Sequence, residues 1–102
     1  MDESTRAQIS DLLEELANQQ AWNEKLWWQC HNAVRANWDD DLLAYVYDEI
    51  VHYSGLFHSR NIFGFRVKPD RYQLAQYRQE FRDVATALRG HLSVKDYRQK
   101  YE

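Results

Sequence analysis

Residues 70–89, DRYQLAQYRQEFRDVATALR, carry apolar side chains at the spacing of one helical face. At about 3.6 residues per turn they form a single stripe, made up of Leu74, Tyr77, Phe81, Val84, Ala85 and Leu88. Asp70 and Gln73 have the spacing of a capping box at its start, and Gly90 is a natural terminator at its end. The stretch predicts a long amphipathic helix whose apolar face other elements must cover.

Helical spacing also recurs on both sides of this stretch. Further helices are expected at about 5–19, 22–37, 40–54 and 93–101. Polar residues 18–23 interrupt the first apolar stripe, but no Gly or Pro enforces a break there. The sequence is therefore compatible either with one long helix through this stretch or with two helices. Asp39-Asp40-Asp41 offers capping carboxylates for the following helix, and Gly55 is expected to end that helix. Trp38 is assigned to the buried face of the helix before it.

The connection at residues 55–69 lacks a helical period and is rich in aromatic side chains. Phe63, Phe65 and Val67 alternate along it, and the single proline that follows favours extended backbone before it. Because this loop is too apolar for a solvated linker, we expect it to pack against something. The chain has only three Gly and one Pro, too few for the many tight turns of an all-β fold.

These patterns predict one domain over residues 1–102. Its fold class is all-α, a compact antiparallel bundle of four to five helices with one aromatic-rich irregular loop at 55–69. The single cysteine, Cys30, lies at the centre of an apolar face, so we expect it to be a buried small hydrophobe. The polar, acidic first residues and the lack of a long apolar run indicate a cytoplasmic protein without membrane contact.

The charges are distributed unevenly along the chain. Its net charge is −3, but residues 1–50 hold eleven acids against three bases, whereas residues 51–102 hold five acids against ten bases. Such a split fits internal pairing, self-association, or a basic face that meets an outside partner.

An arginine ridge runs along the predicted helix at 70–89. Its members, at spacings of seven, four and seven residues, share one line beside the apolar stripe; they are Arg71, Arg78, Arg82 and Arg89. Guanidinium groups bind carboxylates or phosphates through bidentate forks, so these four are candidate anion-binding or partner-binding residues. The alternative is that they pair with the acidic first half of the same chain or lie over the edge of the core.

Several aromatic residues are candidates for a partner interface. Trp28 projects to the polar side of its helix, although its neighbours Trp22 and Trp27 fit the buried face. Trp is favoured at binding hot spots because it buries a large area with few rotatable bonds. The proposed interface comprises Trp28, Tyr45, Phe57, Phe63 and Phe65.

Glu49 and His52 form a Glu-x-x-His pair, a spacing used by di-iron helical bundles. Such a site needs a second copy of the motif and two further glutamates, and this sequence has one copy only. Glu49 and His52 are therefore weak candidate metal ligands. The sequence has no phosphate loop, nucleophile elbow or Cys-x-x-Cys motif, so we expect no catalysis and no cofactor.

The sequence leaves three functions open. The leading hypothesis is a small non-catalytic protein-binding or regulatory module that acts through the arginine ridge and exposed aromatics, and that self-associates as a homodimer. The alternative is a nucleic-acid-binding protein that uses the basic second half, which the acidic overall charge disfavours. The third is a metal-binding enzyme centred on Glu49 and His52.

Overall fold

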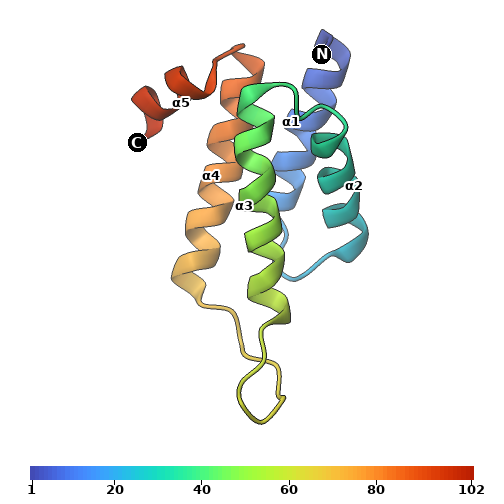
Figure 1. Cartoon of the computed structure of the whole chain (residues 1–102), viewed down its shortest axis with the longest axis vertical. Coiled ribbons are helices and arrows are strands. Elements are labelled where there is room, and N and C mark those ends of the chain that lie inside the picture. The colour runs from blue at the N-terminus through green and yellow to red at the C-terminus, as the bar shows by residue number, and fades with distance from the viewer.

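Five α-helices make up the fold, which is known from a computed structural model that describes residues 1–102 (Figure 1). In chain order they are α1 (Glu3–Ala17), α2 (Glu24–Arg35), α3 (Asp41–His58), α4 (Arg71–Arg89) and α5 (Val94–Tyr101). The molecule is elongated, with extents of 46 × 27 × 22 Å. The prediction of an all-α bundle is confirmed.

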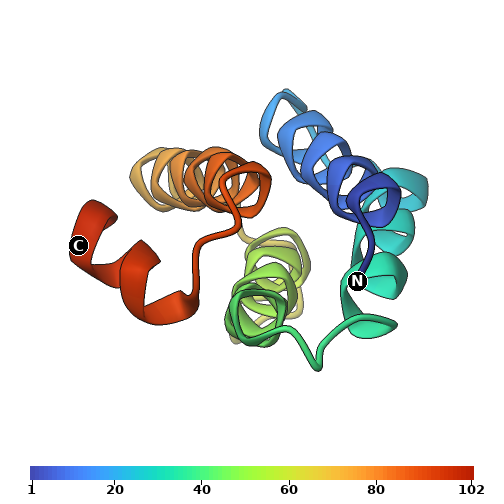
Figure 2. The same ribbon diagram turned by 90° about the horizontal axis from the view of Figure 1, so that it is seen from above.

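The first four helices run alternately down and up the bundle, so each is antiparallel to the next (Figure 1). Viewed from above, they enclose a common centre, with α1 packed against both α2 and α4, and α3 completing the ring (Figure 2). The short helix α5 lies beside α3 and α4, at the end of the bundle where the N-terminus is, and contacts both (Figures 1 and 2). The opposite end carries the connection between α3 and α4, which extends beyond the helices (Figure 1).

The core is apolar and takes side chains from every helix. The most completely buried are Ile9, Leu13, Leu16, Cys30, Val34, Leu42, Leu43, Val46, Ile50, Tyr53, Phe81, Val84 and Leu88. Burial raises the pKa of the Cys30 thiol to about 12, as expected for an inert core cysteine. The indole of Trp27 satisfies its one donor by a 3.0 Å hydrogen bond to the carbonyl oxygen of Ile50.

Short polar side chains set the helix boundaries. Asp70 accepts hydrogen bonds from the backbone N–H groups of the first turn of α4, and Asp40 does the same for α3, both as predicted. The question left open at 18–23 is settled by Asn23. Its side chain accepts from the N–H of Leu26 at 3.1 Å and begins α2 as a separate helix.

Two predictions are wrong, one about where α3 ends and one about the burial of Trp38. Gly55 does not end α3, which continues to His58; the ring of Phe57 packs 5.2 Å from that of Trp22, and this tertiary contact outweighs the poor helix propensity of glycine. The irregular segment is therefore 59–70 rather than 55–69. Trp38 is 57% exposed instead of buried. Because α2 ends at Arg35, its helical periodicity does not determine the direction of the Trp38 side chain.

Candidate functional site

Residues 59–70 form a hairpin that projects beyond the end of the bundle (Figure 1). Its two arms are joined by backbone hydrogen bonds from Val67 to Ser59 at 2.8 Å and from Asn61 to Phe65 at 2.9 Å. An isolated antiparallel bridge pairs Arg60 with Arg66 between them. The connection is therefore an ordered structural element.

Asn61 fixes the turn at the end of the hairpin. Its side-chain oxygen accepts from the N–H groups of Phe63 at 2.9 Å and Phe65 at 3.1 Å, and its carbonyl accepts from Gly64 at 3.0 Å. Gly64 has φ +82°, a left-handed conformation that glycine adopts without steric cost. The backbone N–H groups of Asn61, Phe63, Gly64 and Phe65 therefore all find acceptors within the hairpin.

The end of the hairpin is apolar and faces solvent. Ile62 is 94% exposed, Phe63 76% and Phe65 70%; these three side chains are called the hairpin tip. The expectation that the loop packs against something is wrong for this part of it, because the hairpin extends beyond the helices that would cover it (Figure 1). Exposed apolar side chains gathered at one place make the hairpin tip a candidate interaction site.

Positive charge lies along the two arms of the hairpin. Arg60, Arg66 and Lys68 are all exposed, and none forms a salt bridge; together they are called the basic collar. The one acid in the hairpin, Asp70, accepts from the first turn of α4. The hairpin thus carries an apolar end and, along its arms, three cations without ion-pair partners.

The arginine ridge divides into two pairs. Arg89 forms salt bridges with Asp11 at 2.7 Å and with Glu14. Arg82 donates to the carbonyl of Ala17 at 3.2 Å and to the side chain of Asn18 at 3.3 Å. These two arginines join α4 to α1, which is the internal pairing that the sequence left as an alternative.

The other pair, Arg71 and Arg78, lies at the hairpin end of α4 and forms no salt bridge. Both line a cleft of about 620 Å³, called the Arg78 cleft, whose walls include Trp22, Phe57, Lys68 and Leu74. The Nε and Nη2 atoms of Arg78 are buried without a hydrogen-bond partner. Burial raises the pKa of the Tyr53 hydroxyl, and the nearby guanidinium of Arg78 opposes part of that rise.

The remaining interface candidates lie apart from the hairpin. Trp28 is 48% exposed on α2, as its helical phase predicts, and its ring packs edge-on against Trp27 at 4.8 Å. Phe57 is half-buried against Trp22. The hydroxyl of Tyr45 donates to Glu80. Of the five aromatic candidates, only Phe63 and Phe65 share one exposed surface.

Sequence reasoning missed Glu80. Burial raises the pKa of its carboxyl group to about 7; the neighbouring Glu49 and Glu102 add to that rise, and the hydrogen bond from Tyr45 opposes it. The partners of Glu80 come from α3 and the chain's last residue, and no spacing within α4 signals them.

Glu49 and His52 do not form part of a larger ligand set. Glu49 is half-buried and lies beside Glu80, whereas His52 is exposed. No group of three or more His, Cys, Asp or Glu side chains gathers where a metal ion could be held.

Comparison with known proteins assigns no relative. No family model, no curated protein and no solved structure matches the chain. None of its helices has both the length and the apolar content to span a bilayer.

Proposed function

We propose that the protein is a non-catalytic binding module that attaches to a protein partner by inserting its hairpin tip into an apolar pocket. The observation that carries this proposal is the exposure of Ile62, Phe63 and Phe65 on one fixed turn. A turn whose backbone is already held in position loses little backbone freedom on binding, so more of the burial energy of its side chains becomes affinity.

The magnitudes fit an anchor of this kind. Full burial of one large apolar side chain contributes roughly 1.5–3 kcal/mol, so three such side chains offset much of the cost of association. The basic collar of Arg60, Arg66 and Lys68 then favours a pocket with an acidic rim, which speeds encounter and sets orientation.

The distribution of cations favours a protein partner over nucleic acid. Electrostatic binding to nucleic acid grows with the number of phosphates that a protein neutralises. Here Arg82 and Arg89 are held by α1, so only Arg71 and Arg78 of the arginine ridge remain to extend the basic collar along α4. The net charge of −3 also opposes a polyanion.

A second copy of the chain is one such protein partner. Residues 1–50 supply eleven acids that a basic collar can meet, which keeps self-association within the proposal. Light scattering across a range of concentrations tests this case directly. A strict monomer at high concentration restricts the proposal to a different protein.

Photo-cross-linking tests the proposed function. A photoreactive phenylalanine analogue at Ile62 should give one specific protein adduct in the native host, and the same analogue at Val51, an exposed position on α3, should not. Calorimetry with the purified partner should then show at least about 30-fold weaker binding, roughly 2 kcal/mol, for Phe63→Ser/Phe65→Ser. Val51→Ser should bind like the wild type.

Two results would overturn the proposal. One is a partner that binds the Phe63→Ser/Phe65→Ser variant as tightly as the wild type. The other is hairpin-dependent binding to anionic vesicles or to nucleic acid without any protein partner, which would assign the hairpin tip to a different class of surface.

A further inference from the structure

We infer that the Arg78 cleft binds a small molecule that joins a flat aromatic ring to a carboxylate or phosphate group. This ligand site is separate from the hairpin tip and goes beyond the proposed function. Lys68 is the one residue shared with the hairpin surface, because it lines the cleft and also belongs to the basic collar.

The charge of the cleft selects an anion. Lys68, Arg71 and Arg78 contribute three positive charges, and no Asp or Glu lines the cleft. None of the three cations takes part in a salt bridge. The nearest acid in sequence, Asp70, is occupied by the N–H groups of Tyr72 and Gln73. An oxyanion in the cleft therefore meets uncompensated positive charge.

Arg78 supplies the specific contact for that anion. Its Nε and Nη2 atoms lie on one edge of the guanidinium, the edge that binds two oxygens of a carboxylate or phosphate in a bidentate fork. Both atoms are buried and form no hydrogen bond of normal geometry, although the guanidinium lies close enough to the Tyr53 hydroxyl to affect its pKa; such incomplete pairing costs free energy. Because both atoms are covered, binding requires the guanidinium to turn toward the ligand, whose two oxygens would then accept from Nε and Nη2.

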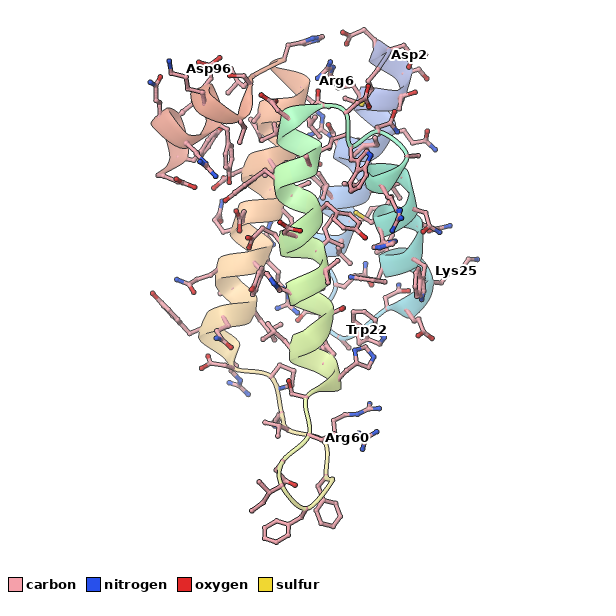
Figure 3. The ribbon with its side chains drawn as sticks, viewed as in Figure 1. Asp2, Arg6, Trp22, Lys25, Arg60 and Asp96 are labelled. Carbon is pink, nitrogen blue, oxygen red and sulfur yellow. The ribbon has the colours of Figure 1, made fainter.

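The opposite wall of the cleft selects an aromatic ring. Trp22, from the segment between α1 and α2, packs against Phe57 of α3 with ring centroids 5.2 Å apart. Figure 3 shows Trp22 at the hairpin end of the bundle, above Arg60 at the neck of the hairpin. Trp22 is only partly buried, so the part of its ring that Phe57, Trp27, Tyr53 and His58 leave uncovered can contact a ligand ring.

The size of the cleft fits such a ligand. Its volume of about 620 Å³ lies within the range of roughly 300–1,000 Å³ found for small-molecule sites. Such sites combine an apolar wall with a few convergent polar groups. Here Trp22, Phe57 and Leu74 form the wall, and Arg71 and Arg78 are the polar groups.

NMR spectroscopy tests this inference with four probes and ¹⁵N-labelled full-length protein. Naphthalene-2-carboxylate and 2-naphthyl phosphate carry both a ring and an anion, whereas 2-naphthylmethanol lacks the charge and acetate lacks the ring. The two ring-bearing anions should shift the Nε–Hε resonance of Arg78 and the indole N–H of Trp22 saturably. They should bind at least about tenfold more tightly than the two control probes. The stronger of the two anions identifies carboxylate or phosphate as the natural group.

Substitutions separate the cleft from the hairpin. Arg78→Met and Arg71→Met should each weaken binding of the anionic probes about tenfold, and Lys95→Met on α5, also exposed, should not. Arg71 is exposed, so its variant remains informative if Arg78→Met fails to fold. The hairpin variant Phe63→Ser/Phe65→Ser should bind the probes normally, so loss of partner binding and loss of ligand binding are distinguishable.

The inference is overturned by any of three results. These are no saturable shift at millimolar probe, equal affinity for 2-naphthylmethanol and the anions, or unchanged affinity in both Arg71→Met and Arg78→Met.

Discussion

Arg89 near the end of α4 donates from Nη2 to the Asp11 carboxylate of α1 across 2.7 Å. Glu14, one turn further along α1, accepts from the other terminal nitrogen of the same guanidinium. Arg89 thereby pairs the acidic first half of the chain with the basic second half. Part of the charge asymmetry in the sequence is thus used inside the fold.

Arg89→Met should destabilise the fold slightly. The side chains of Arg89 and Asp11 are 39% and 68% exposed, and exposed ion pairs contribute only about 0.2–1 kcal/mol. Urea denaturation should show a loss of that size at low salt and a smaller loss at high salt, because ions screen exposed pairs. Lys95→Met, a matched loss of one positive charge, should have no comparable salt-dependent effect. A salt-independent loss would assign Arg89 to packing instead.

Glu80→Gln should remove a pH dependence of stability. The folded state raises the pKa of Glu80 from 4.5 to about 7, so between these values the folded chain holds a proton that the unfolded chain releases. The free energy of unfolding therefore falls as the pH rises through this window. Gln resembles the protonated acid, so Glu80→Gln should be more stable than the wild type at pH 8, by roughly 1 kcal/mol after allowance for partial exposure.

Chemical denaturation at pH 5 and pH 8 measures this difference, with Glu15→Gln as the exposed control. Tyr45→Phe provides a second test. The Tyr45 hydroxyl lowers the pKa of Glu80, so its removal should raise that pKa further, as followed by NMR titration of the carboxyl carbon. Equal stability gains at both pH values in Glu80→Gln would contradict this account.

The parts of the fold that the sequence predicted correctly depend on local information. The α4 stripe is periodic within one segment, and the caps at Asp40 and Asp70 act on N–H groups two or three residues away. Trp28 is exposed because its position within α2 determines its helical phase.

The parts that the sequence did not predict depend on contacts between distant segments. Arg71, Arg78, Arg82 and Arg89 share one helical line, yet α1 reaches only the last two. Trp22 was assigned to the apolar face of α2, but it lies before that helix begins and lines the Arg78 cleft. Helical phase gives a residue's direction, whereas its neighbour depends on how the helices pack.

Gly64→Ala should loosen the hairpin without unfolding the bundle. A Cβ at this position meets no atom within 4 Å, but φ is +82°, and a left-handed conformation costs an L-residue about 1–2 kcal/mol. Hydrogen exchange should accelerate at the amides of Phe63 and Phe65, which Asn61 protects. The melting temperature should change little, because the hairpin tip contributes nothing to the core. Unchanged exchange at both amides would show that Asn61 alone determines the turn.

Gly55→Ala should have the opposite effect. Gly55 lies inside α3, not at its end, and a Cβ there also meets nothing within 4 Å. Ala in a helix interior is favoured over Gly by about 0.5–1 kcal/mol, because it restricts the unfolded chain. The free energy of unfolding should rise by that amount, with NMR spectra otherwise unchanged. A loss of stability would mean that α3 ends near residue 54, as the sequence predicts. Phe57 would then lie outside the helix, and a continuous α3 would not bring it to Trp22.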